Sequence, residues 1–265
     1  MNIITLTTDF GATDWFVGSM KGVILGINPQ AKMVDITHDI PGGNIHTAAF
    51  ALSACYRCFS KDTVHVAVVD PGVGSSRAAI AVRTQDYVFV GPDNGILSLA
   101  LAQEQVLEIR RLDHSQYFHK PLSHTFHGRD VFAPVAAHLT LGVPLKEFGM
   151  ELNKYVQISW PQVSVLDGAV HGEVVYIDHF GNAITNVAAA DLAKLAQHAP
   201  SVFLRGEQVC AVKNYYQEVA SGEAVGVIGS SGFLEIGVNG GHAVRALGLR
   251  IGEPVEVHGA PSTIK

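Results

Sequence analysis

The order of secondary-structure signals along the chain constrains its fold most strongly. In the first 160 residues, short apolar runs typical of buried strands alternate with segments in which apolar residues recur at helical spacing. After Val163 the pattern changes to short strands separated by turns, as in GEVVYID, AVGVIG and GFLEIGV. We therefore predict two differently built domains, an N-terminal α/β domain at residues 1–160 and a C-terminal β domain at residues 161–265.

The alternating part predicts a mostly parallel sheet with helices on both faces. Strands are expected at residues 2–7, 33–36, 64–69, 79–82, 87–90 and 106–109, and helices at residues 14–28, 44–59, 96–102 and 129–141. Periodicity is lost between Val143 and Pro161, which indicates a linker with a short helix. The later strands predict a smaller, mainly antiparallel, barrel-like sheet.

Composition argues against several classes of partner. The 265 residues include 18 Lys and Arg against 24 Asp and Glu, for a net charge of -6. Nucleic-acid affinity depends on clustered basic side chains, so no nucleic-acid partner is expected. No apolar run approaches the roughly 20 residues of a membrane span, and the start MNIITLTTDFG lacks the features of a secretory signal. We expect a cytoplasmic protein with no membrane partner.

Polar residues beside glycines mark the ends of several predicted strands. These segments are TTDFG (7–11), VVDPGVG (68–74), GPDNG (91–95), FHGRD (126–130), DHFGNAITN (178–186) and GSSGFLEIGVNGG (229–241). Ligands of open α/β sheets bind at the carboxyl ends of the strands. These segments are therefore expected at a ligand site.

The candidate residues of the first domain each have a structural alternative. Asp9 could accept two hydrogen bonds from a ribose diol or cap the next helix, although Asp14 is better placed as a cap. Asp70, in an Asp-Pro-Gly sequence, is either catalytic or a turn former, and Arg77 could fold back onto it. His127 is one of 13 histidines, most of which are expected to have no catalytic role.

In the second domain, Asp178, Phe180 and Asn182 combine an acid, an aromatic face and an amide. Such a set suits a ligand with an ammonium group and a ring carrying nitrogens. A β-turn that uses Asp, Gly and Asn for its geometry would produce the same sequence.

Metal and cofactor chemistry are less well supported. The Asp and His residues that could be ligands lack a recognised metal-binding spacing; they are Asp9, Asp70, Asp93, His127, Asp178 and His179. Neither a G-x-S-x-G elbow nor a G-x-G-x-x-G fingerprint is present. We expect neither a metal nor a cofactor.

Taken in order, the six segments resemble those of the S-adenosyl-L-methionine (SAM) hydroxide adenosyltransferase family, the hydrolytic branch of the group that contains the fluorinase and the chlorinase. The resemblance runs from Asp9 to Gly241. It implies that SAM is the substrate, cleaved to adenosine and methionine by water attacking C5′. It also implies a homotrimer whose sites form between the N-terminal domain of one subunit and the C-terminal domain of its neighbour.

The resemblance also implies roles for individual residues. Asp70, Arg77 and His127 match the water-activating trio, and from these chemistries we expect Asp70 to fix Arg77 and the water while His127 accepts or relays the proton. The substrate contacts implied are Asp9 for the ribose, Asp178 and Ser230 for the methionine ammonium and carboxylate, and Phe180, Asn182 and the backbone near Asn239 and Gly240 for the adenine.

Asp70 separates the branches of the group, because halogenating relatives carry Tyr there and an acid would repel a halide. Gly128 resembles the chlorinase. Two alternatives therefore stay open: a halogenase that forms a 5′-halo nucleoside, and a non-catalytic sensor of SAM or adenosine.

Overall fold

The chain forms two compact units, Met1–Ile158 and Ser159–Lys265, in a computed structural model that describes residues 2–195 and 200–259. The predicted boundary after residue 160 lies two residues beyond the division between these units. No helix in the described part of the chain is long and apolar enough to cross a membrane.

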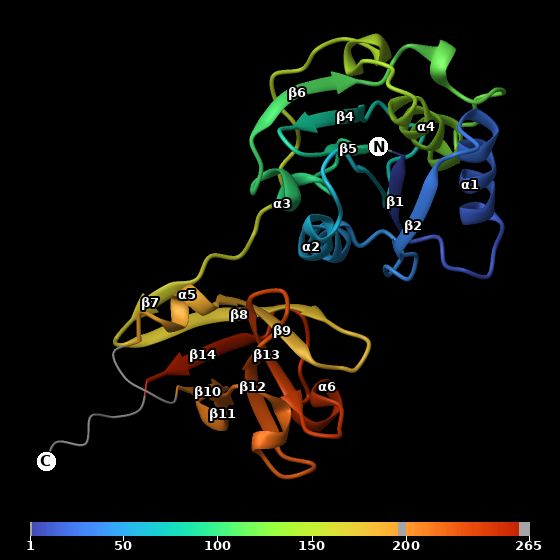
Figure 1. Cartoon of the computed structure of the whole chain (residues 1–265). Helices are drawn as coiled ribbons and strands as arrows, with labels where there is room; N and C mark the ends of the chain where they lie inside the picture. Colours follow the sequence, from blue (N-terminus) through green and yellow to red (C-terminus); the bar gives the residue numbers. More distant parts are fainter. Residues whose placement is uncertain (1, 196–199, 260–265) are drawn as a thin grey trace, which may run out of the picture. The chain divides into compact units, whose positions relative to one another are not determined.

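The first unit contains a six-stranded sheet with the order β2-β1-β3-β5-β4-β6 (Figure 1). Its strands are β1 (Ile3–Thr8), β2 (Lys32–Thr37), β3 (Val64–Val68), β4 (Ala79–Thr84), β5 (Val88–Pro92) and β6 (Val106–Arg111). Strands β2, β1, β3 and β5 run parallel, whereas β4 is antiparallel to β5 and β6. The mostly parallel prediction misses this reversal, which arises because only three residues join β4 to β5 and a parallel crossover needs a dozen or more.

Helices cover both faces of this sheet, as predicted. They are α1 (Phe16–Ile27), α2 (Ile45–Cys55), α3 (Ser98–Leu101) and α4 (Ala133–Thr140). Helix α1 packs with α4 on one face, and α2 with α3 on the other (Figure 1). Alternate residues of β3 enter the two cores, with Val66 and Val68 on the α1 side and Ala67 on the α2 side. The predicted α/β class is confirmed.

Two helix starts differ from the sequence prediction. Helix α1 begins at Phe16, and Trp15 at its N-cap position makes no side-chain capping bond, so Asp14 is not the cap. The helix predicted at residues 129–141 begins as a π-helical turn, η3 (Gly128–Phe132), directly after His127. Wide turns of this kind often occur at functional sites. The short 3₁₀ turns of this unit are η1 (Tyr56–Cys58), η2 (Ser115–Tyr117) and η4 (Leu145–Phe148).

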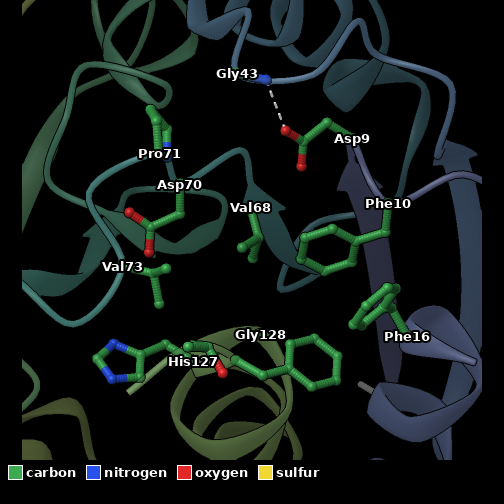
Figure 2. Close-up of a pocket in the computed structure, with 12 residues that line it drawn as sticks. Asp9, Phe10, Phe16, Gly43, Val68, Asp70, Pro71, Val73, His127 and Gly128 are labelled. Atoms are coloured by element: carbon green, nitrogen blue, oxygen red, sulfur yellow. Dashed lines mark hydrogen bonds between the residues drawn. The ribbon is translucent and has the colours of Figure 1, made fainter. Parts of the chain in front are cut away.

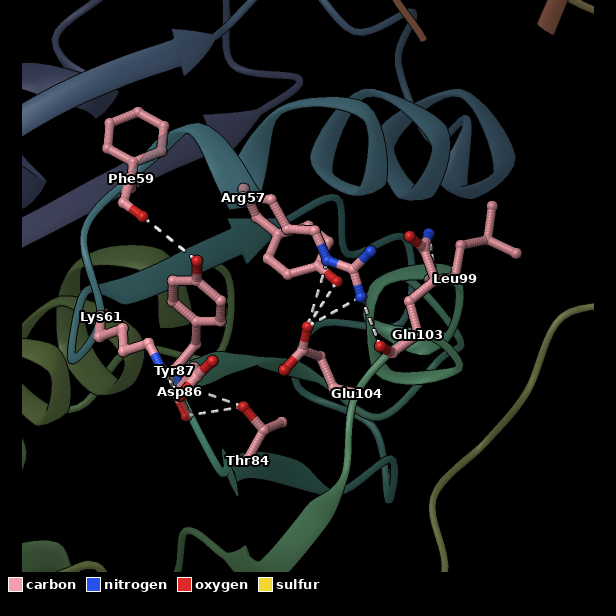
Figure 3. Close-up of polar contacts among 10 residues, drawn as sticks. Arg57, Phe59, Lys61, Thr84, Asp86, Tyr87, Leu99, Gln103 and Glu104 are labelled. Carbon is pink, nitrogen blue, oxygen red and sulfur yellow. Dashed lines mark hydrogen bonds and ion pairs between the residues drawn. The ribbon is translucent and has the colours of Figure 1, made fainter. Parts of the chain in front are cut away.

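Polar contacts fasten the η1 turn to the sheet and to α3 (Figure 3). The Tyr87 hydroxyl donates to the Phe59 carbonyl at 3.2 Å, and Lys61 pairs with Asp86 at 2.9 Å. The Arg57 guanidinium donates to Glu104 at 3.2 Å. Asp86 lies in the connection between β4 and β5, at the amino end of β5, so this cluster is remote from the carboxyl ends of the parallel strands.

The second unit is a closed barrel of short strands. Its strands are β7 (Ser164–Leu166), β8 (Ala169–Ile177), β9 (Ala183–Ala188), β10 (Ser201–Leu204), β11 (Glu207–Lys213), β12 (Ala224–Ile228), β13 (Phe233–Val238) and β14 (Pro254–His258). They pair in the order β14-β10-β11-β12-β13-β9-β8-β7, and an additional β14–β8 pairing closes the barrel. Only the β11–β12 pair among the described strands of this unit is parallel, so the mainly antiparallel, barrel-like prediction is confirmed. The helical segments are α5 (Ala189–Leu192), η5 (Tyr216–Glu218) and α6 (Ala243–Leu247).

Candidate active site

A pocket of about 350 Å³ lies at the carboxyl ends of β1 and β3 (Figure 2). Asp9 follows β1 and Asp70 follows β3, and because these strands are parallel neighbours both acids reach the same edge of the sheet. His127, just before η3, lines the pocket as well. The structure therefore brings together three residues that are far apart in the sequence.

Arg77 joins Asp70 to His127. Its Nε donates to Asp70 Oδ1 at 3.0 Å, and its Nη2 donates to Asp70 Oδ2. The same Nη2 lies 2.8 Å from His127 Nδ1. The Asp70 and Arg77 side chains are 5% and 12% exposed, so this two-point ion pair is well shielded from water.

This geometry fixes the protonation state of His127. A guanidinium has no acceptor and stays protonated, so Nδ1 must accept from Arg77 and the imidazole is neutral with its proton on Nε2. Burial, and then the neighbouring Arg77 charge, hold the pKa of His127 below its usual value, while Asp70 and Asp130 act in the opposite direction. The trio therefore combines one carboxylate, one guanidinium and one neutral imidazole.

The loop from Asp70 to Arg77 folds back on itself. The Val73 amide donates to the Asp70 carbonyl at 3.1 Å, and the Arg77 amide donates to Ser75 Oγ at 3.2 Å. Gly74 has a φ of +78° and lies against the His124 carbonyl so closely that a Cβ would clash with it. Asp70 is thus both a turn former and a pocket residue.

Asp9 and a group of rings line another part of the pocket. Asp9 Oδ2 accepts the Gly43 amide at 2.8 Å, which orients the carboxylate and leaves it further acceptor capacity (Figure 2). The Phe10, Phe16 and Phe126 rings pack together with centroid distances of 5.1 to 5.8 Å. The alternative role of Asp9 as a helix cap is not what the structure shows, since α1 starts at Phe16.

The GPDNG segment is not among the residues that line this pocket. Asn94 Nδ2 donates to the Val69 carbonyl at 2.8 Å, directly before Asp70. Asp93 Oδ1 accepts the Val156 amide at 2.8 Å. The segment therefore supports the end of β3, and its place at a ligand site stays a prediction.

A second pocket, of about 730 Å³, lies in the barrel unit. It brings together five of the predicted substrate contacts: Asp178, Phe180, Asn182, Ser230 and Gly240. Asn239 is not among the lining residues, and its Nδ2 donates to the Val219 carbonyl at 2.9 Å.

Asp178 shapes the turn between β8 and β9. Its Oδ1 accepts the Asn182 amide at 2.8 Å, and its Oδ2 accepts Asn182 Nδ2 at 3.0 Å. The turn-forming role is thus present together with exposure to the pocket. Phe180, between them, is 71% exposed, so its ring faces outward at the pocket.

Sequence reasoning missed Glu235 and Tyr216, which also line the barrel pocket. The Tyr216 hydroxyl donates to Glu235, whose pKa is raised mainly by burial, with a smaller contribution from Asp178. The signal for Glu235 was available, because it is an acid within the apolar run FLEIGV. Tyr216 gave no comparable signal.

The sequence matches the models of two domains of one family. Residues 4–149 match the SAM hydroxide adenosyltransferase N-terminal domain, and residues 172–256 match the C-terminal domain. The chain belongs to the SAM hydroxide adenosyltransferase family. Within the described residues, no group of three or more His, Cys, Asp or Glu side chains is arranged to hold a metal ion.

Individual relatives agree with this membership. A protein of Salinispora tropica named (R)-S-adenosyl-L-methionine hydrolase is 38% identical, over 96% of this chain and 97% of its own. A protein named fluorinase from an Actinoplanes species is 27% identical, over 72% of this chain and 74% of its own. The crystal structure of an uncharacterized conserved protein from Thermotoga maritima has a TM-score of 0.92 and 39% identity, covering 96% of this chain and 99% of that one.

Proposed function

We propose that this protein is a SAM hydrolase that forms adenosine and L-methionine. The observation that carries the proposal is the linked Asp70–Arg77–His127 trio beside the first pocket, in a member of a family with relatives named as SAM hydrolases. Asp9, in the same pocket, would bind the ribose diol. The barrel pocket, with Asp178, Phe180 and Asn182, would recognise the methionine ammonium and the adenine ring.

The reaction requires a well-placed nucleophile more than an acid. The oxygen of water forms a bond to C5′ while the C5′–S bond breaks. The electron pair of the broken bond stays on sulfur, which becomes the neutral thioether of methionine. The water loses one proton, and adenosine and methionine result. Since water is a weak nucleophile, with a pKa near 15.7, orienting it and stabilising hydroxide character both accelerate the attack.

The geometry favours Asp70 as the group that receives the water proton. Asp70 lines the pocket, and each carboxylate oxygen can accept a second hydrogen bond besides that from Arg77. His127 Nδ1 already accepts from Arg77, so the imidazole is better suited to hold the guanidinium than to take a proton. Arg77 would stabilise the developing negative charge.

We also propose the homotrimer implied by the family resemblance, in which the N-terminal domain of one subunit and the C-terminal domain of a neighbour complete each site. The exposed Phe180 ring is consistent with a surface that a ligand or a neighbour covers. A cytoplasmic location and the absence of a cofactor stay predictions of the sequence.

The proposal is tested by incubating the purified protein with SAM in ¹⁸O-labelled water and identifying products by chromatography and mass spectrometry. We expect equal amounts of methionine and adenosine, with the label in the 5′-hydroxyl. D70A should lose activity. Labelled adenosine from D70A at the wild-type rate would contradict the assignment of Asp70.

Halogenation is the second candidate, supported by the similarity to fluorinases. Chloride or fluoride added to the same assay would then yield a 5′-halo nucleoside. SAM binding without methionine release would instead indicate a sensor.

A further inference from the structure

We infer that Asp130 is a positioning residue that holds His127 in place through residues 123–126, which directly precede it. The inference rests on the proposed function only for its effect on turnover. The contacts themselves belong to the loop that leads into η3 and to the first residues of that π-helical turn.

Asp130 is a fully buried acid without a role in the steps proposed above. Its Oδ1 accepts Arg129 Nε at 2.6 Å, and its Oδ2 accepts the Ser123 amide at 2.8 Å. Its own carbonyl accepts the His119 amide at 2.9 Å. One residue thus fastens both ends of the segment 119–123 to η3.

Ser123 is the link to the site. Its amide donates to the Asp130 side chain, and the Asp130 amide donates at 3.1 Å to the carbonyl of Phe126, the residue directly before His127. Asp130 therefore holds the loop segment that leads into His127, while Arg77 engages the ring at Nδ1.

Further contacts of the same loop limit its movement. Ser123 Oγ accepts the Phe126 amide at 3.0 Å, and the Arg129 guanidinium lies over the Phe126 ring at 5.4 Å. On the other side, the His124 carbonyl packs against Gly74, in the loop that carries Arg77. We therefore expect a change at residue 130 to shift the loop that carries His127.

The negative charge of Asp130 adds an electrostatic signature. It raises the pKa of His127 against the larger lowering effects of burial and of Arg77. Replacing Asp130 by Asn removes the charge but keeps an oxygen that can accept the Ser123 amide. Replacing it by Ala removes both.

The test compares D130N and D130A with wild-type protein in an NMR titration of the histidine rings, with the His127 signal assigned from H127Q. D86N is the matched control, because it breaks the Lys61–Asp86 ion pair in the same unit at the remote cluster of Figure 3. We expect D130N to titrate His127 at lower pH than wild type, and D86N to leave that signal unchanged. D130A opens a buried cavity and could fail to fold for that reason alone. In that case the His127 titration of D130N, which conserves side-chain volume, tests the inference.

Turnover is measured on the same variants. Misplacing a group near the reacting atoms can cost about 100-fold, so we expect kcat to fall by roughly 10-fold in D130N and 100-fold in D130A, with KM changing less than about 3-fold. A His127 titration unchanged in folded D130N would overturn the inference. If wild-type protein released no methionine, the proposed function would fail while the titration still tested the link between Asp130 and His127.

Discussion

The two pockets of this protein are built on different principles. In the first unit, Asp70, Arg77 and His127 are bonded to one another, so their positions are set before any ligand binds. In the barrel unit, Phe180 is 71% exposed and Tyr215 is 59% exposed, and the pocket is lined by acids, amides and rings without a Lys or Arg. The contrast suggests that the first pocket is organised for the chemical step and the second for binding a cationic ligand with a flat ring.

Arg77→Met should produce the largest effect. It removes the charge that links Asp70 to His127 while keeping much of the side-chain volume. Loss of a preorganised charge contact costs about 100- to 1,000-fold in kcat, and we expect KM for SAM to change far less. The measurement is steady-state methionine release.

Arg110→Gln is its control, because Arg110 lies on β6 outside the pocket and pairs with Glu108 and Glu151. Equal losses in both variants would show that the effect comes from general destabilisation.

Acid should weaken the two units unequally. His65 is buried among Tyr56, Phe59, Tyr87 and Phe89, and burial lowers its pKa to about 3. The unfolded chain binds this proton near pH 6.5, so the first unit should lose stability as pH falls from 6.5 towards 3, by at most about 1.4 kcal/mol per pH unit.

His65→Phe should remove this pH dependence. In the barrel unit the raised pKa of Glu235 acts with the opposite sign, since a group that holds its proton more tightly when folded favours the folded state at low pH. Urea unfolding at several pH values, followed by tryptophan fluorescence, checks this. The W160F variant keeps only Trp15, in the first unit, and the W15F variant keeps only Trp160, in the barrel unit. Parallel pH curves for wild type and H65F would refute it.

Phe180→Ala should affect binding rather than chemistry. Stacking of a base on an aromatic ring contributes about 1 to 3 kcal/mol, so KM should rise about 10-fold or more while kcat stays within about 3-fold. Leu166→Ala, which truncates an exposed apolar residue on β7 of the same unit, is the control. A fall in kcat at unchanged KM would place Phe180 in the chemical step and erase the contrast between the pockets.

Asn94→Ala should give the smallest effect. It removes the hydrogen bond to the Val69 carbonyl beside Asp70, which is expected to lower the free energy of unfolding by about 1 kcal/mol. Because Arg77 still holds Asp70, we expect kcat to fall only a few-fold. Thermal unfolding and turnover measured on the same sample separate the two effects, and a loss as large as that of R77M would mean that Asn94 has a direct role.

The sequence predicts much of the fold because strand and helix periodicity are local properties. It does not predict the direction of β4, which depends on a connection of three residues. That direction matters for the site: β4 antiparallel to β5 starts at the edge where β3 ends, so Arg77 returns to Asp70 within one short loop. A parallel β4 would have placed Arg77 at the opposite edge.

The site residues were foreseeable to different degrees. Asp9, Asp70 and His127 stand within two residues of a glycine at strand or helix ends, where a polar side chain signals a site. For Asn239 the sequence predicts a backbone contact, which stays a prediction, and the bond from its side chain to the Val219 carbonyl carries no sequence signal. The buried contact between Asp130 and Ser123 depends on a backbone amide, which carries no sequence signal.

The close approach of Gly74 to the His124 carbonyl makes the two loops of the first pocket interlock. A shift of either loop would alter this contact, so we expect their movements to be coupled. Amides on both sides of this contact are therefore expected to exchange hydrogen with solvent in a single concerted opening, although 50 residues separate Gly74 from His124 along the chain.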